Sequence, residues 1–358
     1  MSLSKTIPKV GVTIEHIAQE AGVSPGTVSR VLNGKNKENR PAIAARANRI
    51  RKIASEMGYR PNAAARSMTR GRFDLVAVMT CGDLGFDWFP LSMLHGIHGS
   101  LEQAKSRLVV NEVCGQRMAD PEFVPRIFRE SAVDGVLLQL DAKLDPKIHA
   151  LFESQPMPLV QLNKKHAQRC VYPDEVLGGQ IATRHLLDLG RRAIGYFQLD
   201  LSSHPHFSVT DRYAGYSQAM RQAGLDFSPS QVGDVRFSDI AGNAVDCACD
   251  FLGAHKGLDA VVCYGLKDVI AIRTAAAQMG IRVPDDLDLI VFNEREAHAQ
   301  VGWPTHTMII PFKQVGARAA DMVLDLIDQG DGAGPAAVPY EHLFDTVTGQ
   351  IKTLRPGA

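Results

Sequence analysis

The sequence has few cysteines, few aromatic residues and no long apolar run, and each of these absences narrows the class of protein. Six of its 358 residues are cysteines, and none lies in a CxxC pair or near a histidine at the spacing of a zinc site. We therefore expect reduced thiols, no metal site and no cofactor, as in a cytoplasmic protein. No apolar run is long enough to cross a membrane, and the N-terminus lacks the apolar core of an export signal.

A net charge is also absent, because 39 Lys and Arg side chains balance 39 Asp and Glu side chains. These charges are unevenly distributed along the chain. Residues 1–72 contain 14 basic and 4 acidic side chains, a charge of +10, whereas residues 73–358 contain 25 basic and 35 acidic side chains, a charge of −10. A basic segment ahead of an acidic remainder predicts a head that binds phosphate. A solvated basic face without a partner is the alternative.

Two short helices joined by a tight turn are predicted within residues 12–33. Thr13 precedes an apolar stripe at helical spacing and is a typical N-cap residue. Gly22 supplies the turn, Ser24 caps the second helix, and Pro25 occupies the first position of that helix. A short polar second helix that bears an arginine fits the major groove of DNA.

The outer face of this second helix supplies the candidate DNA contacts. Arg30 is the first candidate for base reading, because its guanidinium can bond both O6 and N7 of guanine; a phosphate contact is the alternative. Pro25 and Gly26 offer no side-chain hydrogen-bonding group, although Pro25 can contact a thymine methyl group. The candidates in this segment are Thr13, Ser24, Pro25, Gly26, Thr27, Ser29, Arg30 and Asn33.

From residue 73 onward, apolar runs alternate with amphipathic helical stretches. This alternation is typical of parallel sheets covered by helices on both faces, and the length predicts two α/β subdomains around a cleft. The strand-like runs are 75–79, 108–113, 133–140, 158–162, 193–199, 259–264 and 287–292. The helical stretches include 175–189, 212–223 and 313–329.

The segment 12–33 closely resembles the N-terminal helix-turn-helix of the lactose-repressor family of bacterial transcription regulators. Residues 57–68, MGYRPNAAARSM, resemble the hinge segment of the same family. Further segments resemble its effector domain, which has the type I periplasmic-binding-protein fold: 131–138, 173–197, 211–225 and 279–294.

The resemblance implies an α/β protein with three parts. An all-α helix-turn-helix domain at 1–59 precedes a hinge helix or linker at 60–72. The rest of the chain, 73–358, forms an effector-binding and dimerisation domain of two α/β subdomains with parallel sheets. Within it, the helical stretch from Met93 to Leu101 is expected to contribute to the dimer interface.

The resemblance also gives the hinge a role on DNA. Two hinge helices pair on the operator and insert apolar side chains into a minor-groove step, which kinks the DNA. The residues assigned to this contact are Asn62, Ala65 and Met68. The family normally has Leu where this chain has Met68, which is apolar and long but more flexible. A plain linker is the alternative.

The resemblance places an effector in the cleft, where the family holds polyhydroxylated ligands with Asp, Asn and Arg side chains and an aromatic platform. The matching residues are Asp87, Phe89, Asp174, Arg212 and Asn293. Leu266 and Asn293 stand where the family has acids, although Asp268 follows closely. A sugar or sugar derivative is the expected effector, and an anionic ligand is the alternative.

We therefore predict a sequence-specific DNA-binding regulator, a repressor, whose operator affinity is controlled by a small polar ligand. The expected partners are a near-palindromic operator and a second copy of the chain in a homodimer or tetramer. A cytoplasmic solute-binding protein and an α/β sugar-modifying enzyme are the alternatives. The basic head argues against the first, and the lack of a GxSxG motif or a Lys-bearing phosphate loop argues against the second.

Overall fold

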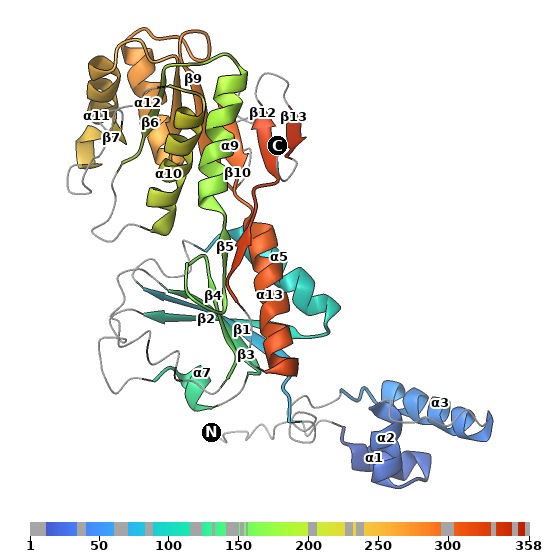
Figure 1. Cartoon of the computed structure of the whole chain (residues 1–358). Helices are drawn as coiled ribbons and strands as arrows, with labels where there is room; N and C mark the ends of the chain where they lie inside the picture. The colour runs from blue at the N-terminus through green and yellow to red at the C-terminus, as the bar shows by residue number, and fades with distance from the viewer. Residues whose placement is uncertain are drawn as a thin grey trace, which may run out of the picture. The chain divides into compact units, whose positions relative to one another are not determined.

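The chain divides into two compact units, Met1–Phe73 and Asp74–Ala358, which we call the head and the body (Figure 1). The computed structural model describes residues 12–33, 41–60, 71–82, 89–114, 124–130, 133–140, 150, 154, 157–199, 206–225, 232–233, 240–294, 304–330, 334–345 and 350–354. Within these ranges, every helix is too short or too polar to cross a lipid bilayer.

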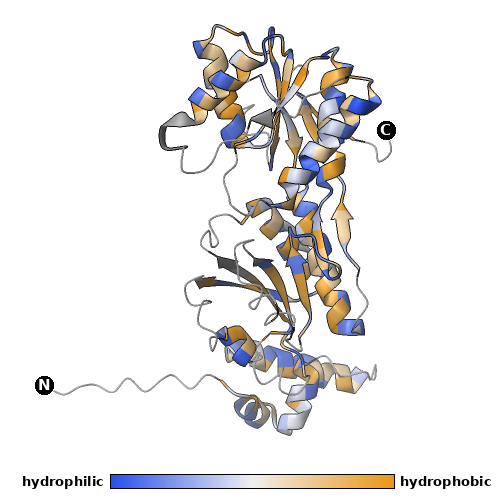
Figure 2. Ribbon diagram, turned by 60° about the vertical axis from the view of Figure 1, so that its left-hand side comes forward, coloured by the Kyte–Doolittle hydropathy of each residue, from blue (hydrophilic) through white to orange (hydrophobic). Residues whose placement is uncertain are grey.

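The central strands of the body are mostly hydrophobic, as the orange colour along much of their length in Figure 2 shows. Strands β4 (Leu159–Leu162), β6 (Ile194–Phe197) and β8 (Ala260–Cys263) are buried at every position. Continuous burial is expected for parallel strands that carry helices on both faces. This pattern explains why the apolar runs of the sequence predicted the strands well.

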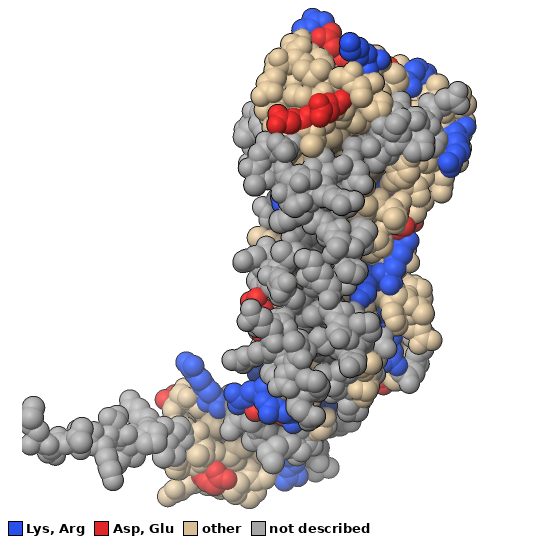
Figure 3. Space-filling model, turned by 90° about the vertical axis from the view of Figure 1, so that its left-hand side faces the viewer, with Lys and Arg blue, Asp and Glu red and all other residues tan. Residues whose placement is uncertain are grey.

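The head contains helices α1 (Ile14–Ala21), α2 (Pro25–Leu32) and α3 (Pro41–Glu56). Gly22 ends α1 in the left-handed conformation, with φ 66°, and so makes the turn into α2. The three helices share an apolar core that includes Ile17, Val28 and Ile50. Lys and Arg side chains lie on the surface of this unit (Figure 3), as the charge distribution of the sequence predicted.

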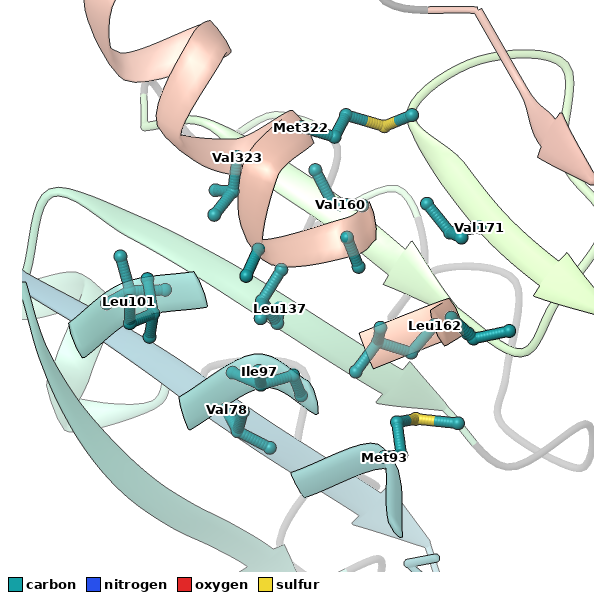
Figure 4. Packing of buried hydrophobic residues seen from close by; sticks show 14 of the residues in the cluster. Val78, Met93, Ile97, Leu101, Leu137, Val160, Leu162, Val171, Met322 and Val323 are labelled. Atoms are coloured by element: carbon teal, nitrogen blue, oxygen red, sulfur yellow. The ribbon is translucent and has the colours of Figure 1, made fainter. Parts of the chain in front are cut away.

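The first lobe of the body contains a parallel sheet with the strand order β11-β5-β4-β3-β1-β2. Helices α5 and α13 cover one face of the sheet. Their buried side chains, such as Met93, Ile97 and Val323, meet Leu137 and Val160 of the strands (Figure 4). The further elements of this lobe are β1 (Leu75–Gly82), α5 (Leu91–Gln103), β2 (Arg107–Cys114), α7 (Arg126–Arg129), β3 (Gly135–Leu140), β5 (Cys170–Pro173), α13 (Phe312–Gln329) and β11 (Ala336–Val338).

The second lobe has the strand order β13-β12-β10-β9-β8-β6-β7. Strands β10, β9, β8, β6 and β7 run parallel. Strand β12 pairs antiparallel with β10, and β13 pairs antiparallel with β12. The further elements are α9 (Glu175–Asp188), α10 (Phe207–Gln222), β7 (Val232–Gly233), α11 (Ile240–Ala254), α12 (Leu266–Gln278), β9 (Asp288–Asn293), β10 (His306–Ile309), β12 (His342–Asp345) and β13 (Gln350–Thr353).

The chain passes between the two lobes three times. It leaves the first lobe after β5 and enters α9, returns after β10 into α13, and leaves again after β11 into β12. Each lobe is therefore assembled from segments that are far apart in the sequence. The α/β fold class with two parallel-sheet subdomains is confirmed.

The structure corrects one detail of the sequence interpretation and refines another. Helix α10 begins at Phe207, five positions before the predicted start, because His206 acts as its N-cap residue. Within the stretch predicted to contribute to the dimer interface, Met93, Ile97 and Leu101 are at most 1% exposed and pack inside their own lobe, so only the other face of this helix is open to a partner. Leu91, which is 48% exposed, is the outward apolar residue of α5.

Two pairs of helices, α5 with α13 and α9 with α10, pack so closely at glycine positions that their backbones are in contact. A Cβ atom on Gly96 of α5 would lie 1.9 Å from the carbonyl oxygen of Lys313 in α13, and one on Gly316 would lie 2.1 Å from that of Met93. Gly179 of α9 has the same relation to Arg212 of α10, at 2.2 Å. No side chain fits at these positions unless the helices separate.

We predict that Gly96→Ala lowers the free energy of unfolding by about 1–3 kcal/mol or more, because the added methyl group overlaps backbone that cannot rotate away. Gly99→Ala is the matched control in the same helix, since its Cβ would have no atom within 4 Å. The control should be stabilised by about 0.5–1 kcal/mol through helix propensity. Urea denaturation of both variants measures the difference, and equal effects would contradict the close helix contact.

Candidate DNA-binding and effector sites

Helix α2 presents a short polar face with a defined N-terminus. The side-chain oxygen of Ser24 accepts a hydrogen bond from the backbone N–H of Thr27 at 3.3 Å, and the two hydroxyl oxygens lie 3.0 Å apart. Pro25, Gly26 and Arg30 are exposed, whereas Thr27 is half-buried. The cap predicted from the sequence is therefore present, and it leaves the first turn of α2 open to a partner.

The remaining candidates of the head lie at the two ends of this helix pair. Arg30 donates from Nε to the carbonyl oxygen of Gly26 at 3.3 Å, so its side chain lies along its own helix. Asn33, the C-cap residue of α2, donates from Nδ2 to the hydroxyl of Ser29 at 3.1 Å. Thr13 is the N-cap residue of α1, and its backbone N–H donates to Nδ1 of His16 at 3.3 Å.

Several predicted site residues lie outside the described residues. These are Asn62, Ala65 and Met68 of the hinge and Asp87 of the loop after β1. Their roles remain predictions.

Arg212 of α10 is buried in the second lobe and is held by a carboxylate. Its Nε and Nη2 atoms donate to the two oxygens of Glu175 at 2.6 and 2.8 Å. Its Nη1 donates to the backbone oxygen of Tyr264 at 2.8 Å. Burial opposes the charge of the guanidinium, but the adjacent Glu175 carboxylate outweighs it and raises the pKa of Arg212 above its ordinary value.

Aromatic rings complete this environment. The guanidinium carbon of Arg212 lies 4.4 Å from the ring centre of Phe292 and 4.7 Å from that of Tyr264. The hydroxyl of Tyr340 donates to Glu175 at 2.6 Å. Sequence analysis singled out Arg212 but missed Glu175, which directly follows Asp174 in the sequence.

The other predicted effector residues have different surroundings. Asp174 is the N-cap residue of α9 and accepts a hydrogen bond from the backbone N–H of Leu177 at 3.1 Å. Asn293 is half-buried at the carboxyl end of β9, next to Phe292. Phe89 is only 8% exposed and packs in the core of the first lobe, so its ring is not an open platform.

Contacts join the two lobes near the carboxyl ends of their strands. Nε2 of His206 donates to the backbone oxygen of Asn163, just after β4, at 2.7 Å. Because this carbonyl can only accept, Nδ1 of the neutral ring is the acceptor for the Ser208 hydroxyl at 2.8 Å. Elsewhere the hydroxyl of Ser92 donates to the carboxylate of Glu294 at 2.8 Å.

Among the described residues, some of the buried polar atoms without a partner lie in the carboxyl-terminal halves of the strands or just beyond them. In parallel α/β sheets, ligands bind outside this edge. Within the described part of the chain, several buried side-chain oxygens there have no hydrogen-bond partner: Thr80 Oγ1, Gln139 Oε1, Gln161 Oε1, Asn163 Oδ1 and Gln198 Oε1. They belong to both lobes, and sequence analysis did not identify any of them, because single polar residues within apolar strands give no spacing signal.

Comparison with known proteins agrees with both halves of this architecture. Residues 13–62 match the family of bacterial regulatory proteins of the lacI type, and residues 183–346 match the periplasmic-binding-protein-like domain. The repressor PurR of Photobacterium profundum is 24% identical over 319 residues, covering 88% of this chain and 92% of that protein. The regulator GalR of Escherichia coli is 25% identical over 320 residues, covering 88% and 89%.

Solved structures show the same fold. The Lac repressor dimer bound to operator and the anti-inducer ONPF superposes with a TM-score of 0.70 at 19% identity, over 92% of this chain and 96% of that one. The complex of the transcriptional regulator CelR with cellobiose gives a TM-score of 0.61 at 24% identity, over 93% and 98%.

A helix-turn-helix head and a two-lobed body of the periplasmic-binding-protein type define a DNA-binding transcription regulator rather than an enzyme. The chain belongs to the lacI family of bacterial regulatory proteins. Regulators of this family bind operator DNA and small-molecule effectors.

We predict that stability depends on pH through Asp268, which is 4% exposed at the N-terminus of α12. Burial raises the pKa of this carboxyl to about 7 from its ordinary 3.8, although the backbone N–H of Leu199 donates to it at 2.6 Å. The folded state therefore favours the protonated acid. This stabilisation is fully present below pH 4 and is lost as the pH rises toward 7, at a cost on the order of 4 kcal/mol.

Asp268→Asn should remove this dependence, because the amide remains neutral. Urea denaturation at pH 5 and pH 8 should show the variant gaining stability relative to the wild type at the higher pH. Asp246→Asn, at an exposed position of α11, controls for the loss of one carboxylate. If the free energy of unfolding changes with pH in the same way for wild type and Asp268→Asn, Asp268 is ionised in the folded protein at both pH values and the prediction is wrong.

Proposed function

We propose that this protein is a repressor that binds a near-palindromic operator as a homodimer. A small polar effector would either lower or raise its affinity for the operator. The observation that carries this proposal is the pairing of an open helix-turn-helix in a basic head with a body whose strand ends hold unpaired oxygens. The site of action is the cytoplasm, where the chromosome lies. Association of two dimers into a tetramer is an additional state to test.

The head would read DNA with α2. Its exposed first turn is small, because Pro25 and Gly26 have short side chains or none, so the helix can lie close to the floor of the major groove. Arg30 would then leave its contact with its own backbone and bond guanine or phosphate. Thr27, Ser29 and Asn33 supply hydroxyl and amide groups beside it.

The hinge would add a contact in the minor groove. Asn62, Ala65 and Met68 belong to a segment too short to be a stable helix alone in water. Pairing of two such segments on DNA would form the helix and place Met68 as the apolar wedge. This step needs two chains, which is one reason to propose a dimer.

Exposed apolar side chains support a dimer through the body. Leu91 of α5 and Val110 of β2 are 48% and 43% exposed in the first lobe, and Leu266 and Ile270 of α12 are 42% and 41% exposed in the second. Large apolar residues at such exposure favour contact with another protein surface. A two-fold dimer would present two heads to a two-fold operator.

The effector would bind at the carboxyl edges of the two sheets. Hydroxyl groups of a ligand can donate to the unpaired oxygens of Thr80, Gln161 and Gln198, which favours a polyhydroxylated compound. A sugar or sugar derivative fits, and the CelR relative is described with cellobiose. Arg212, Asp174 and Asn293 would border this ligand, together with Asp87 of the segment after β1, whereas Phe89 packs in the core of the first lobe.

An anionic effector is the second candidate, but the geometry of Arg212 disfavours it. Its guanidinium already forms two bonds to Glu175 and one to Tyr264, so little positive charge is left for a ligand. Coupling between effector and operator should be about 1–3 kcal/mol and reciprocal.

We predict that Arg30→Ala weakens binding to the selected operator by about 1–3 kcal/mol and relaxes preference at one base pair in each half-site. The operator is first selected from random duplexes, and affinity is measured by fluorescence anisotropy on operator and on random DNA. Arg51→Ala, at an exposed position of α3, is the charge-matched control. An equal loss on both DNAs would assign Arg30 to phosphate.

We further predict that Thr80→Val weakens effector binding without lowering stability. Valine has the same shape, and the Thr80 hydroxyl has no partner among the described residues, so only a contact to a ligand is lost. Thr307→Val is the matched control, since its buried hydroxyl is also unpaired within the described chain but lies in β10, away from the carboxyl edge.

The ligand is first found by a thermal-shift screen of cellobiose, other neutral sugars, sugar phosphates and nucleobases. Calorimetry then compares the two variants with the chosen compound. Loss in Thr80→Val alone supports the proposed site, and unchanged affinity in Thr80→Val would place the ligand elsewhere.

A further inference from the structure

Three potential metal ligands meet at the opposite edge of the second lobe. His185 lies in the last turn of α9, His306 is the first residue of β10, and Asp345 is the last residue of β12. One ligand atom from each residue lies within 4.8 Å of the others. The cluster is separate from the proposed effector site, because His306 and the nearby Asp288 stand at the amino ends of their strands.

Two of the three distances between ligand atoms are close to those around a single ion, and the third is within 4.8 Å. Nε2 of His185 lies 3.1 Å from Nδ1 of His306, and that nitrogen lies 3.5 Å from Oδ1 of Asp345. Ligands about 2.0–2.2 Å from a tetrahedral zinc ion are separated by roughly 3.3–3.6 Å. The two imidazole planes are inclined by 74°, so the nitrogens converge without the rings stacking.

A fourth residue supports the orientation of His306. Oδ1 of Asp288 lies 3.3 Å from Nε2 of His306, on the far side of the ring. A carboxylate in that position favours a proton on Nε2 and leaves the lone pair of Nδ1 directed at the cluster. Histidine ligands of metal ions are commonly oriented by carboxylates in this way.

A positive group beside the cluster is exposed to solvent. Lys352 of β13 forms an ion pair with Asp345, and its side chain is 48% exposed. Arg191 lies 3.5 Å from Asp288, which is not one of the three ligands. His306 and Asp345 are almost completely buried, whereas His185 is half-buried. An ion would therefore enter beside His185 and Lys352 and displace the ammonium group.

We propose that His185, His306 and Asp345 bind one divalent transition-metal ion of the zinc class, with water as the fourth ligand. Two imidazoles and one carboxylate suit zinc and, as a spectroscopic substitute, cobalt. The ion would join α9, β10 and β12, the three elements of this lobe that each border one passage between the lobes. Its role is to fix these elements to one another.

The competing interpretation is a hydrogen bond between the two histidines beside an Asp–Lys ion pair. The two interpretations predict opposite responses to two substitutions. His185→Gln retains an N–H donor for His306 but cannot provide an imidazole ligand. Lys352→Ala removes the ammonium group that competes with the ion. His255→Gln, just after α11 and outside the cluster, is the matched control.

The test uses the full chain after treatment with a chelator. Calorimetry with zinc chloride should show one equivalent bound per chain, and cobalt chloride should give the absorption of a nitrogen–oxygen site. His185→Gln should weaken zinc binding by roughly tenfold or more, Lys352→Ala should tighten it, and His255→Gln should leave it unchanged.

Zinc should also raise the unfolding temperature of the wild type and of His255→Gln but not of His185→Gln. Circular dichroism confirms that each variant is folded. Because Lys352 is exposed, Lys352→Ala changes the site without disturbing the packing of the core. Absence of stoichiometric zinc binding by the wild type, or equal affinity in wild type and His185→Gln, overturns the proposal.

Discussion

The buried ion pair between Arg212 and Glu175 organises the second lobe. Two hydrogen bonds join α10 to the first turn of α9, and a third joins Arg212 to the carboxyl end of β8. The hydroxyl of Tyr340 brings the segment before β12 to the same carboxylate. Removing one partner of such a pair leaves a buried charge uncompensated, which is far more costly than replacing both.

This pair also limits how the lobe can respond to a ligand. Gly179 and Gly215 let α9 and α10 touch at backbone distance immediately beside the pair. Helices α9 and α10 therefore move as one rigid body, together with the carboxyl end of β8. A change in angle between lobes would be absorbed by the connecting segments and by the contacts from His206 to Asn163 and from Ser92 to Glu294.

Regular features of the sequence predicted the fold well, because burial and periodicity are local. The apolar runs at 75–79 and 259–264 became β1 and β8, and Ser24 caps α2 as expected. The sites were harder to predict because they depend on contacts between distant segments. Arg212 was identified without its partner Glu175, and the ring of Phe89 turned out to be core. His185, His306 and Asp345 gave no metal signature, since only the fold brings them together.

The three passages between the lobes have a consequence for biosynthesis. The sheet of the first lobe is completed by β11, and that of the second by β12 and β13. Neither lobe can be finished until these strands have left the ribosome, whereas the three helices of the head can pack as soon as α3 has been made. The nascent body must therefore keep exposed strand edges from pairing with neighbouring chains during most of its synthesis. Slow translation of the segment from α13 to β13 would lengthen that exposed period, whereas the same delay in the head would not.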